Sequence, residues 1–147
     1  MATPLDLGTH TGWATSVDQP WTRNELKALI ASSAAKNSRA GASGLSSTLL
    51  KAAPEEIITA LLALFEGIRV HGVIPKAMAF GLLQPLRKTV SKPSFEDCRP
   101  ITLLEDPMKL YTKGLNDRIQ AAMHEYTTQT GGKTILHHSQ FGFLFNH

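Results

Sequence analysis

The pattern of apolar and polar positions along the chain predicts three amphipathic helices. Apolar residues recur every three or four positions in each of them, which places these residues on one face. The predicted helices cover residues 23–35, 54–70 and 107–126. In the second helix, the apolar face is predicted to consist of Ile57, Leu61, Leu64 and Ile68.

The ends of these helices carry residues that are typical of helix caps. Thr22 and Glu25 have the spacing of a capping box, so Thr22 is expected to cap the first helix. Gly72 is expected to end the second helix in the left-handed conformation. Asp106 and Pro107 suit the N-cap and the first position of the third helix.

Two segments between the second and third helices have the composition of strands. They cover residues 80–88 and 99–104, and a polar loop separates them, so they can pair as a long-looped hairpin. Pro85 and Pro100 each lack an N–H and are expected at a sheet edge or a strand start. The prediction is therefore an α+β fold that is mainly helical and contains a short β-hairpin.

Composition narrows the class of protein. The chain has 147 residues, of which 42% are hydrophobic and 18% charged, and this is enough apolar content for a packed domain. A single cysteine, Cys98, excludes a disulfide framework and argues against a thiolate zinc site. The most apolar run, residues 57–65, is too short to cross a bilayer, and residues 1–20 lack the pattern of a signal peptide. We therefore expect an intracellular protein without a membrane partner.

Basic residues flank the loop between the two predicted strands. Lys88 and Lys92 close or follow the first strand, and Arg99 opens the second, in a chain with a net charge of +3. Pairing of the strands would gather these cations at one end of the hairpin, where they could clamp a phosphate group. Pro100 pushes Arg99 toward an extended backbone. The alternative is that these residues are solvated loop cations without a ligand.

Six sequence elements follow one another between residues 36 and 143: KNSRAGASGLSSTLLKA, HGVIP, GLLQPLRK, CRPITLL, KLYTKGLNDRI and SQFGF. They occur in the order found in the reverse transcriptases of non-LTR retrotransposons, which the chain resembles over these residues. The most specific element is CRPITLL, which is similar to the family motif Tyr-Arg-Pro-Ile-Ser-Leu-Leu. Cys98 stands in place of the usual tyrosine, and Arg39, Ala42 and Ser43 depart from the family's Pro-Gly-Asp element.

The resemblance implies that residues 21–147 are the fingers part of a right-hand polymerase domain. Residues 1–20 are rich in Thr, Gly, Pro and Asp and show no periodicity, so they are expected to form a flexible leader. The resemblance implies that Lys88 and Arg99 contact the incoming nucleotide triphosphate. It also implies nucleic-acid contacts, to an RNA template and a DNA primer, by Lys92, Lys109, Lys113, Arg118 and Gln140. The remainder of the polymerase domain would be a further partner.

The carboxylates that hold the catalytic Mg²⁺ ions in the full-length family belong to the palm, and the sequence is expected to end before it. Asp97, Asp106 and Asp117 fall on different predicted elements or element ends. No metal site or cofactor is therefore expected in this chain, which is predicted to be inactive by itself. The alternative is a relic of a retroelement that serves as a non-catalytic interaction or structural module.

Overall fold

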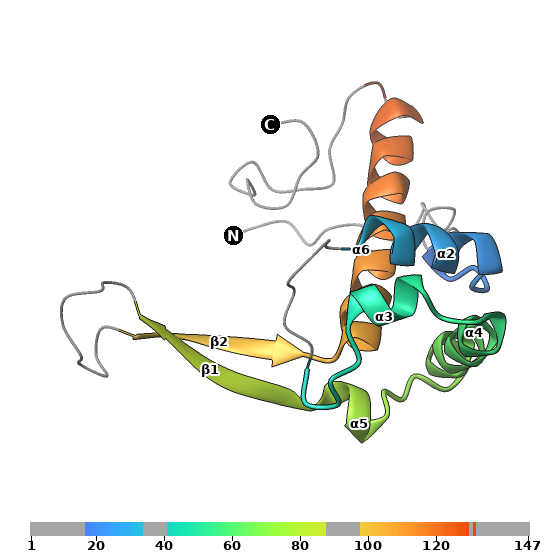
Figure 1. Cartoon of the computed structure of the whole chain (residues 1–147). Coiled ribbons are helices and arrows are strands. Elements are labelled where there is room, and N and C mark those ends of the chain that lie inside the picture. The colour runs from blue at the N-terminus through green and yellow to red at the C-terminus, as the bar shows by residue number, and fades with distance from the viewer. Residues whose placement is uncertain (1–16, 34–40, 88–97, 130, 132–147) are drawn as a thin grey trace. The chain divides into compact units, whose positions relative to one another are not determined.

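The computed structural model describes residues 17–33, 41–87, 98–129 and 131. It divides into two compact units, one of residues 21–112 and the other of residues 1–20 together with residues 113–147. The described elements, in chain order, are α2 (Arg23–Ser32), α3 (Ser47–Lys51), α4 (Glu55–His71), α5 (Lys76–Ala79), β1 (Gly81–Arg87), β2 (Cys98–Leu104) and α6 (Asp106–Gln129). They form a mostly helical α+β fold with a two-stranded antiparallel hairpin, which confirms the predicted fold class (Figure 1). Within the described ranges, no helix is both long and apolar enough to cross a membrane.

An aromatic cluster lies in the core of the unit of residues 21–112. Phe65 on α4 is completely buried and meets Trp21 edge-on, with ring centroids 5.3 Å apart. Its ring also meets that of Tyr111 on α6, at 5.1 Å. The ring centroids of Trp21 and Tyr111 are themselves 5.4 Å apart, so each of the three rings contacts the other two. The cluster joins α4 and α6 to Trp21, which directly precedes the N-cap of α2. The other buried apolar residues of this unit are Leu26, Leu29, Ile30, Leu50, Ile58, Leu61, Ile68, Met78 and Leu110.

The buried face of α4 differs from the predicted one. The buried positions are Ile58, Leu61, Phe65 and Ile68. Ile57, which was expected in the core, is 42% exposed, and Leu64 is only half-buried. Residues 57–65 are apolar on most sides of the helix, so spacing alone admits several faces, and the packing of Phe65 against two rings selects one of them. The predicted left-handed end at Gly72 is confirmed by its φ of 65°.

The capping box predicted at the start of α2 is present. The Thr22 hydroxyl accepts a hydrogen bond from the Glu25 backbone N–H at 3.2 Å, and the Thr22 N–H donates to the Glu25 carboxylate at 3.5 Å. On α2, Arg23 and Lys27 both pair with Glu55 at the start of α4, at 2.6 and 2.5 Å. These ion pairs are exposed, so they contribute little to stability compared with the aromatic cluster.

The start of α6 corrects the role predicted for Asp106. The helix begins at Asp106 itself, so this residue is the first helical position and not the N-cap. Its fully buried carboxylate accepts a hydrogen bond from the Ser47 hydroxyl at 2.5 Å and pairs with the Lys109 ammonium at 2.8 Å. The Glu105 carbonyl instead accepts the first helical hydrogen bond, from the Lys109 N–H. Ser47 on α3 thus binds the Asp106 side chain, which the local sequence had predicted to be a helix cap.

The loop before α3 surrounds the buried carboxylate of Glu105. The Ser43 backbone N–H donates to one carboxylate oxygen at 2.9 Å, and the Ser43 hydroxyl donates to the other. A Cβ atom on Gly41 would lie 2.7 Å from the same carboxyl group, so this close approach requires glycine. The hydrogen bond from the Ser43 hydroxyl, more than any other contact, lowers the pKa of Glu105.

Ser43→Ala is expected to be less stable than the wild type at neutral pH and to approach it in acid. The folded-state pKa of Glu105 lies below its unfolded value of about 4.3, so the carboxylate stabilises the fold above that pH. This contribution is lost as the pH falls through the lower, folded-state pKa. Thermal melts from about pH 7 to about pH 2.5 should therefore show a Tm difference between variant and wild type that shrinks in acid.

The control for this experiment is Ser33→Ala, because the Ser33 hydroxyl donates to the backbone carbonyl of Ile30. Its Tm difference from the wild type should not change with pH. A difference that stays constant for Ser43→Ala as well would show that Ser43 does not act through the charge of Glu105.

Strands β1 and β2 pair along their whole length. Gly81 lies opposite Leu104, and Arg87 lies opposite Cys98, so the hairpin predicted from the sequence is confirmed. Phe80, which was expected in the first strand, precedes it, and Lys88 lies outside the described residues. The strands carry four large exposed apolar side chains: Leu82, Leu83, Leu86 and Ile101. A two-stranded sheet with this much exposed apolar surface is typical of a binding element.

Candidate functional site

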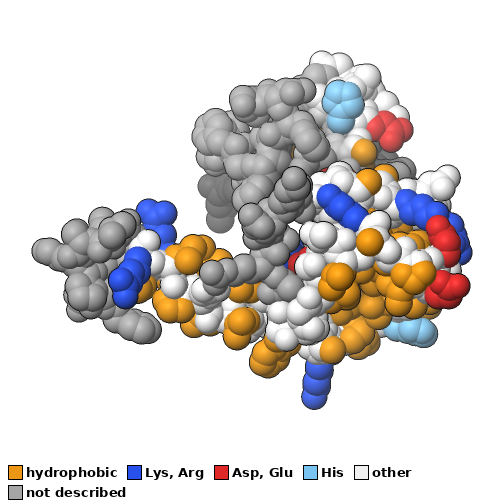
Figure 2. Space-filling model, in the orientation of Figure 1, with side chains coloured by type: hydrophobic (Ala, Val, Ile, Leu, Met, Phe, Trp, Pro, Cys, Tyr) orange, Lys and Arg blue, Asp and Glu red, His pale blue; other side chains and the backbone are white. Residues whose placement is uncertain are grey.

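The loop end of the hairpin brings two arginines onto neighbouring rungs. Arg87 ends β1 opposite Cys98, and Arg99 follows on β2 opposite Leu86. Directly opposite residues share a face of the sheet, and neighbours along a strand alternate between faces. Arg87 and Arg99 therefore lie on opposite faces, and both are exposed. Figure 2 shows Lys and Arg side chains at this end, next to the apolar side chains of the hairpin.

Both arginines are available to a ligand. In the part of the chain that the structure describes, neither Arg87 nor Arg99 forms an ion pair. Pro100 follows Arg99 directly, and both lie in the extended strand β2, as the sequence predicts. The loop end is thus a cationic surface whose charge is not neutralised by a described acid.

Arg87 was missed by the sequence analysis, which placed the cation that closes the first strand at Lys88. Which face Arg87 occupies depends on the register of the two strands, and a one-residue shift would reverse it. No local signal in the sequence sets that register. Of the predicted site residues, Lys88, Lys92 and Gln140 lie outside the described residues. The gathering of Lys88 and Lys92 with Arg99 and the nucleic-acid contact of Gln140 therefore stay predictions.

The lysines predicted on α6 pair with acids of the same helix. Lys109 pairs at 2.8 Å with Asp106, whose carboxylate is fully buried. Lys113 pairs at 2.9 Å with Asp117, and both side chains are about equally exposed, at 40% and 41%. Lys113 can exchange such a surface partner for a phosphate at small cost, whereas Lys109 would leave a buried carboxylate behind. Of the two, Lys113 is the better candidate for nucleic acid.

Arg118 ties α6 to the segment before α2 within the unit of residues 1–20 and 113–147. Its guanidinium donates to the backbone carbonyls of Val17, Gln19 and Pro20 at 3.1, 2.6 and 3.2 Å. These three hydrogen bonds position Arg118, and a phosphate would have to replace them. The contact of Arg118 with nucleic acid therefore stays a prediction, and the observed role of Arg118 is to hold these backbone carbonyls.

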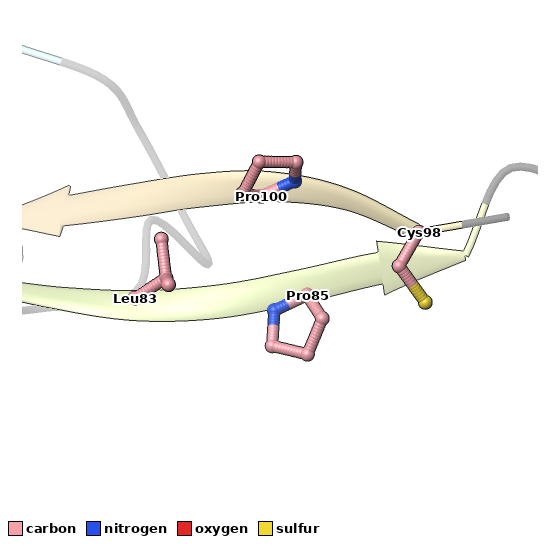
Figure 3. A pocket seen from close by; sticks show the side chains of 4 residues that line it. All are labelled: Leu83, Pro85, Cys98 and Pro100. Atoms are coloured by element: carbon pink, nitrogen blue, oxygen red, sulfur yellow. The ribbon is translucent and has the colours of Figure 1, made fainter. Parts of the chain in front are cut away.

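An open apolar hollow lies on one face of the hairpin, close to its loop end. It has a volume of about 260 Å³ and is lined by Leu83 and Pro85 of β1 and by Cys98 and Pro100 of β2. Figure 3 shows these four side chains along the paired strands. By the strand register, Arg87 lies on the same face, directly opposite Cys98. The hollow and one of the two arginines thus form a continuous surface.

Carboxylates do not gather into a metal site in the described part of the chain. Asp106 is held by Ser47 and Lys109, and Asp117 is paired on the surface of α6. Among the described residues, no three His, Cys, Asp or Glu side chains are placed to hold a metal ion together. These residues do not fit the Mg²⁺ ions of the full-length polymerases. No protein-family model matches the chain.

Proposed function

We propose that this chain supplies the fingers part of an RNA-directed DNA polymerase similar to those of non-LTR retrotransposons. The observation that carries the proposal is the hairpin, which has Arg87 and Arg99 at its loop end. Its strands come from two of the elements on which the resemblance rests, GLLQPLRK and CRPITLL. In this proposal the hairpin binds the triphosphate of the incoming nucleotide. The remainder of the polymerase domain supplies the metal-binding carboxylates.

The chemistry of Arg99 suits a phosphate ligand. A guanidinium group keeps its charge at physiological pH and donates two parallel hydrogen bonds to phosphate oxygens. Pro100 restricts the backbone of Arg99 to extended geometry, which reduces the conformational freedom that binding would remove. Arg99 forms no ion pair among the described residues, so a phosphate does not have to displace a carboxylate. The residue therefore contributes affinity and orientation, and no chemical step is assigned to it.

Arg99→Ala is expected to weaken the binding of a nucleoside triphosphate by about 1–3 kcal/mol, the range for a charge-assisted hydrogen bond. Arg99→Lys is not expected to restore the loss, because lysine lacks the planar fork. Both variants should fold like the wild type, since an exposed cation contributes little to stability. The measurement is a titration of the full chain with a fluorescent nucleoside triphosphate at low salt, with circular dichroism to check the fold.

Lys76→Ala is the matched control, because Lys76 is an exposed cation of the same unit and forms no ion pair among the described residues. It should bind the triphosphate like the wild type. If Arg99→Ala also binds like the wild type, the phosphate clamp does not operate, and a retroelement relic with a non-catalytic role becomes the better interpretation. If Arg99→Ala unfolds the chain, Arg99 is structural and the proposal is equally wrong.

A further inference from the structure

Both strands of the hairpin are largely open to solvent. Every residue of β1 and β2, all of which the structure describes, is exposed or only partly buried. Leu83, for example, is 64% exposed. Packing against the helices therefore does little to hold the hairpin in one direction. Its direction must be set mainly where the chain enters β1 and where it leaves β2.

The two connections of the hairpin differ in burial. On the side of β1, Met78 on α5 is buried, but Phe80, which directly precedes the strand, is 62% exposed. On the side of β2, Glu105 alone separates the strand from α6, and it is only 5% exposed. Asp106, which follows it, is completely buried. The connection that leaves β2 is therefore the one that the rest of the unit holds.

Glu105 is bound through both its side chain and its backbone. The Ser43 backbone N–H donates to one carboxylate oxygen at 2.9 Å, and the Ser43 hydroxyl donates to the other. Residues 41–44, called here the latch, form a tight turn that is closed by a hydrogen bond from the Gly44 N–H to the Gly41 carbonyl at 3.2 Å. The Glu105 carbonyl accepts from the Lys109 N–H at 3.0 Å. Glu105 thus joins the end of β2 to the latch and to α6.

The start of α6 is itself fixed to the other helices. Ser47 on α3 donates to the Asp106 carboxylate, and the ring of Tyr111 packs against that of Phe65 on α4. The helix into which β2 leads is therefore a firm reference. The backbone between Leu104 and Glu105 is then the point at which the hairpin can turn, and the Glu105 side chain restrains that point.

We propose that Glu105 is a positioning residue, and that the latch, by binding its carboxylate, fixes the direction of the hairpin relative to the helices. Without this contact the hairpin would pivot about the exposed Phe80 on one side and Leu104 on the other. The latch acts whichever ligand the hairpin binds. Only its use rests on the proposed function: it would present Arg99 to a nucleotide that the remainder of the polymerase domain also has to contact.

The test measures the direction of the hairpin in the full chain by electron paramagnetic resonance. One nitroxide label is placed on Cys98 at the start of β2, which is the single cysteine of the chain, and another on Val70→Cys in α4. Glu105→Ala should broaden the distribution of distances between the two labels and add distances that the wild type does not populate. The broadening is expected because the hairpin loses the contact that restrains its pivot.

Glu55→Ala is the matched control, because Glu55 is an exposed carboxylate that joins α2 to α4 and does not touch the hairpin. It should leave the distribution unchanged. A second pair of labels, on Cys98 and Leu82→Cys, lies within the hairpin and reports whether the two strands stay paired. Its distribution should be the same in Glu105→Ala as in the wild type, which separates a change of direction from a loss of the hairpin.

Gly41→Ala replaces Glu105→Ala if the latter fails to fold by circular dichroism. It keeps the carboxylate, but its Cβ atom would lie 2.7 Å from the Glu105 carboxyl carbon and would push the latch away. An unchanged distribution between Cys98 and Val70→Cys in a folded variant would overturn the inference. So would equal broadening in Glu55→Ala, or broadening within the hairpin itself. None of these measurements uses a ligand, so each of these outcomes would leave the proposed function standing.

Discussion

Phe65→Ala is expected to lower the free energy of unfolding by about 3–5 kcal/mol, the cost of removing a large aromatic side chain from a packed core. Phe65 is completely buried, and its ring contacts those of Trp21 and Tyr111, so the cavity would open between three elements. A typical domain is stable by only about 5–15 kcal/mol, so much of the chain should unfold at physiological temperature. Urea denaturation followed by circular dichroism and tryptophan fluorescence would measure the loss.

Val70→Ala is the control for Phe65→Ala, because Val70 lies on the same helix and is 59% exposed. Its free energy of unfolding should stay within about 0.5 kcal/mol of the wild type. If Phe65→Ala were no more destabilising than Val70→Ala, the aromatic cluster would not be the core of this unit.

Asp106→Ala is expected to destabilise the fold by about 1.5–3 kcal/mol, the range for hydrogen bonds to a charged group. The substitution removes the acceptor of the Ser47 hydroxyl and the partner of Lys109, and it thereby disconnects α3 from the start of α6. The same urea denaturation applies. Asp106→Asn, which keeps an acceptor for Ser47, should lose less stability than Asp106→Ala.

The ion pair between Lys109 and Asp106 allows a structural role of Lys109 to be distinguished from a binding role. Removal of the Lys109 ammonium leaves the buried Asp106 carboxylate without its counter-charge, so Lys109→Ala should lower stability more than an exposed ion pair would. Lys113→Ala, whose partner Asp117 is exposed, should have a small effect on stability. Equal stability of Lys109→Ala and Lys113→Ala would contradict this assignment of the Lys109–Asp106 pair.

The sequence predicted the kinds of element better than the way they pack. The period of apolar residues and the capping residues Thr22 and Gly72 predicted α2 and α4 close to their observed positions. The composition of two segments and the polar loop between them predicted the hairpin. These signals are local, so they survive in any tertiary context. The face that α4 buries is set by contacts of Phe65 with residues distant in sequence, and spacing alone could not choose it. The role of Asp106 was misjudged for the same reason, because its partner Ser47 is 59 positions away.

The candidate site was predictable only in part. Arg99 could be found because Pro100 follows it and because a strand begins there. Arg87 and the apolar hollow could not be found, because both depend on the register that pairs Arg87 with Cys98 and Pro85 with Pro100. The engagement of Arg118 with three backbone carbonyls was equally hidden, since those carbonyls are about a hundred positions away in the chain.

The central claim is that the loop end of the hairpin is a phosphate-binding site, and the salt dependence of binding tests it most directly. The affinity of the wild type and of the double variant Arg87→Ala/Arg99→Ala for a nucleoside triphosphate would be measured across a series of salt concentrations. Phosphate contacts by cationic side chains release counterions, so binding weakens as salt rises. We predict that the double variant folds like the wild type and that its log K falls less steeply with log salt than that of the wild type. An unchanged slope in a folded double variant would contradict the account.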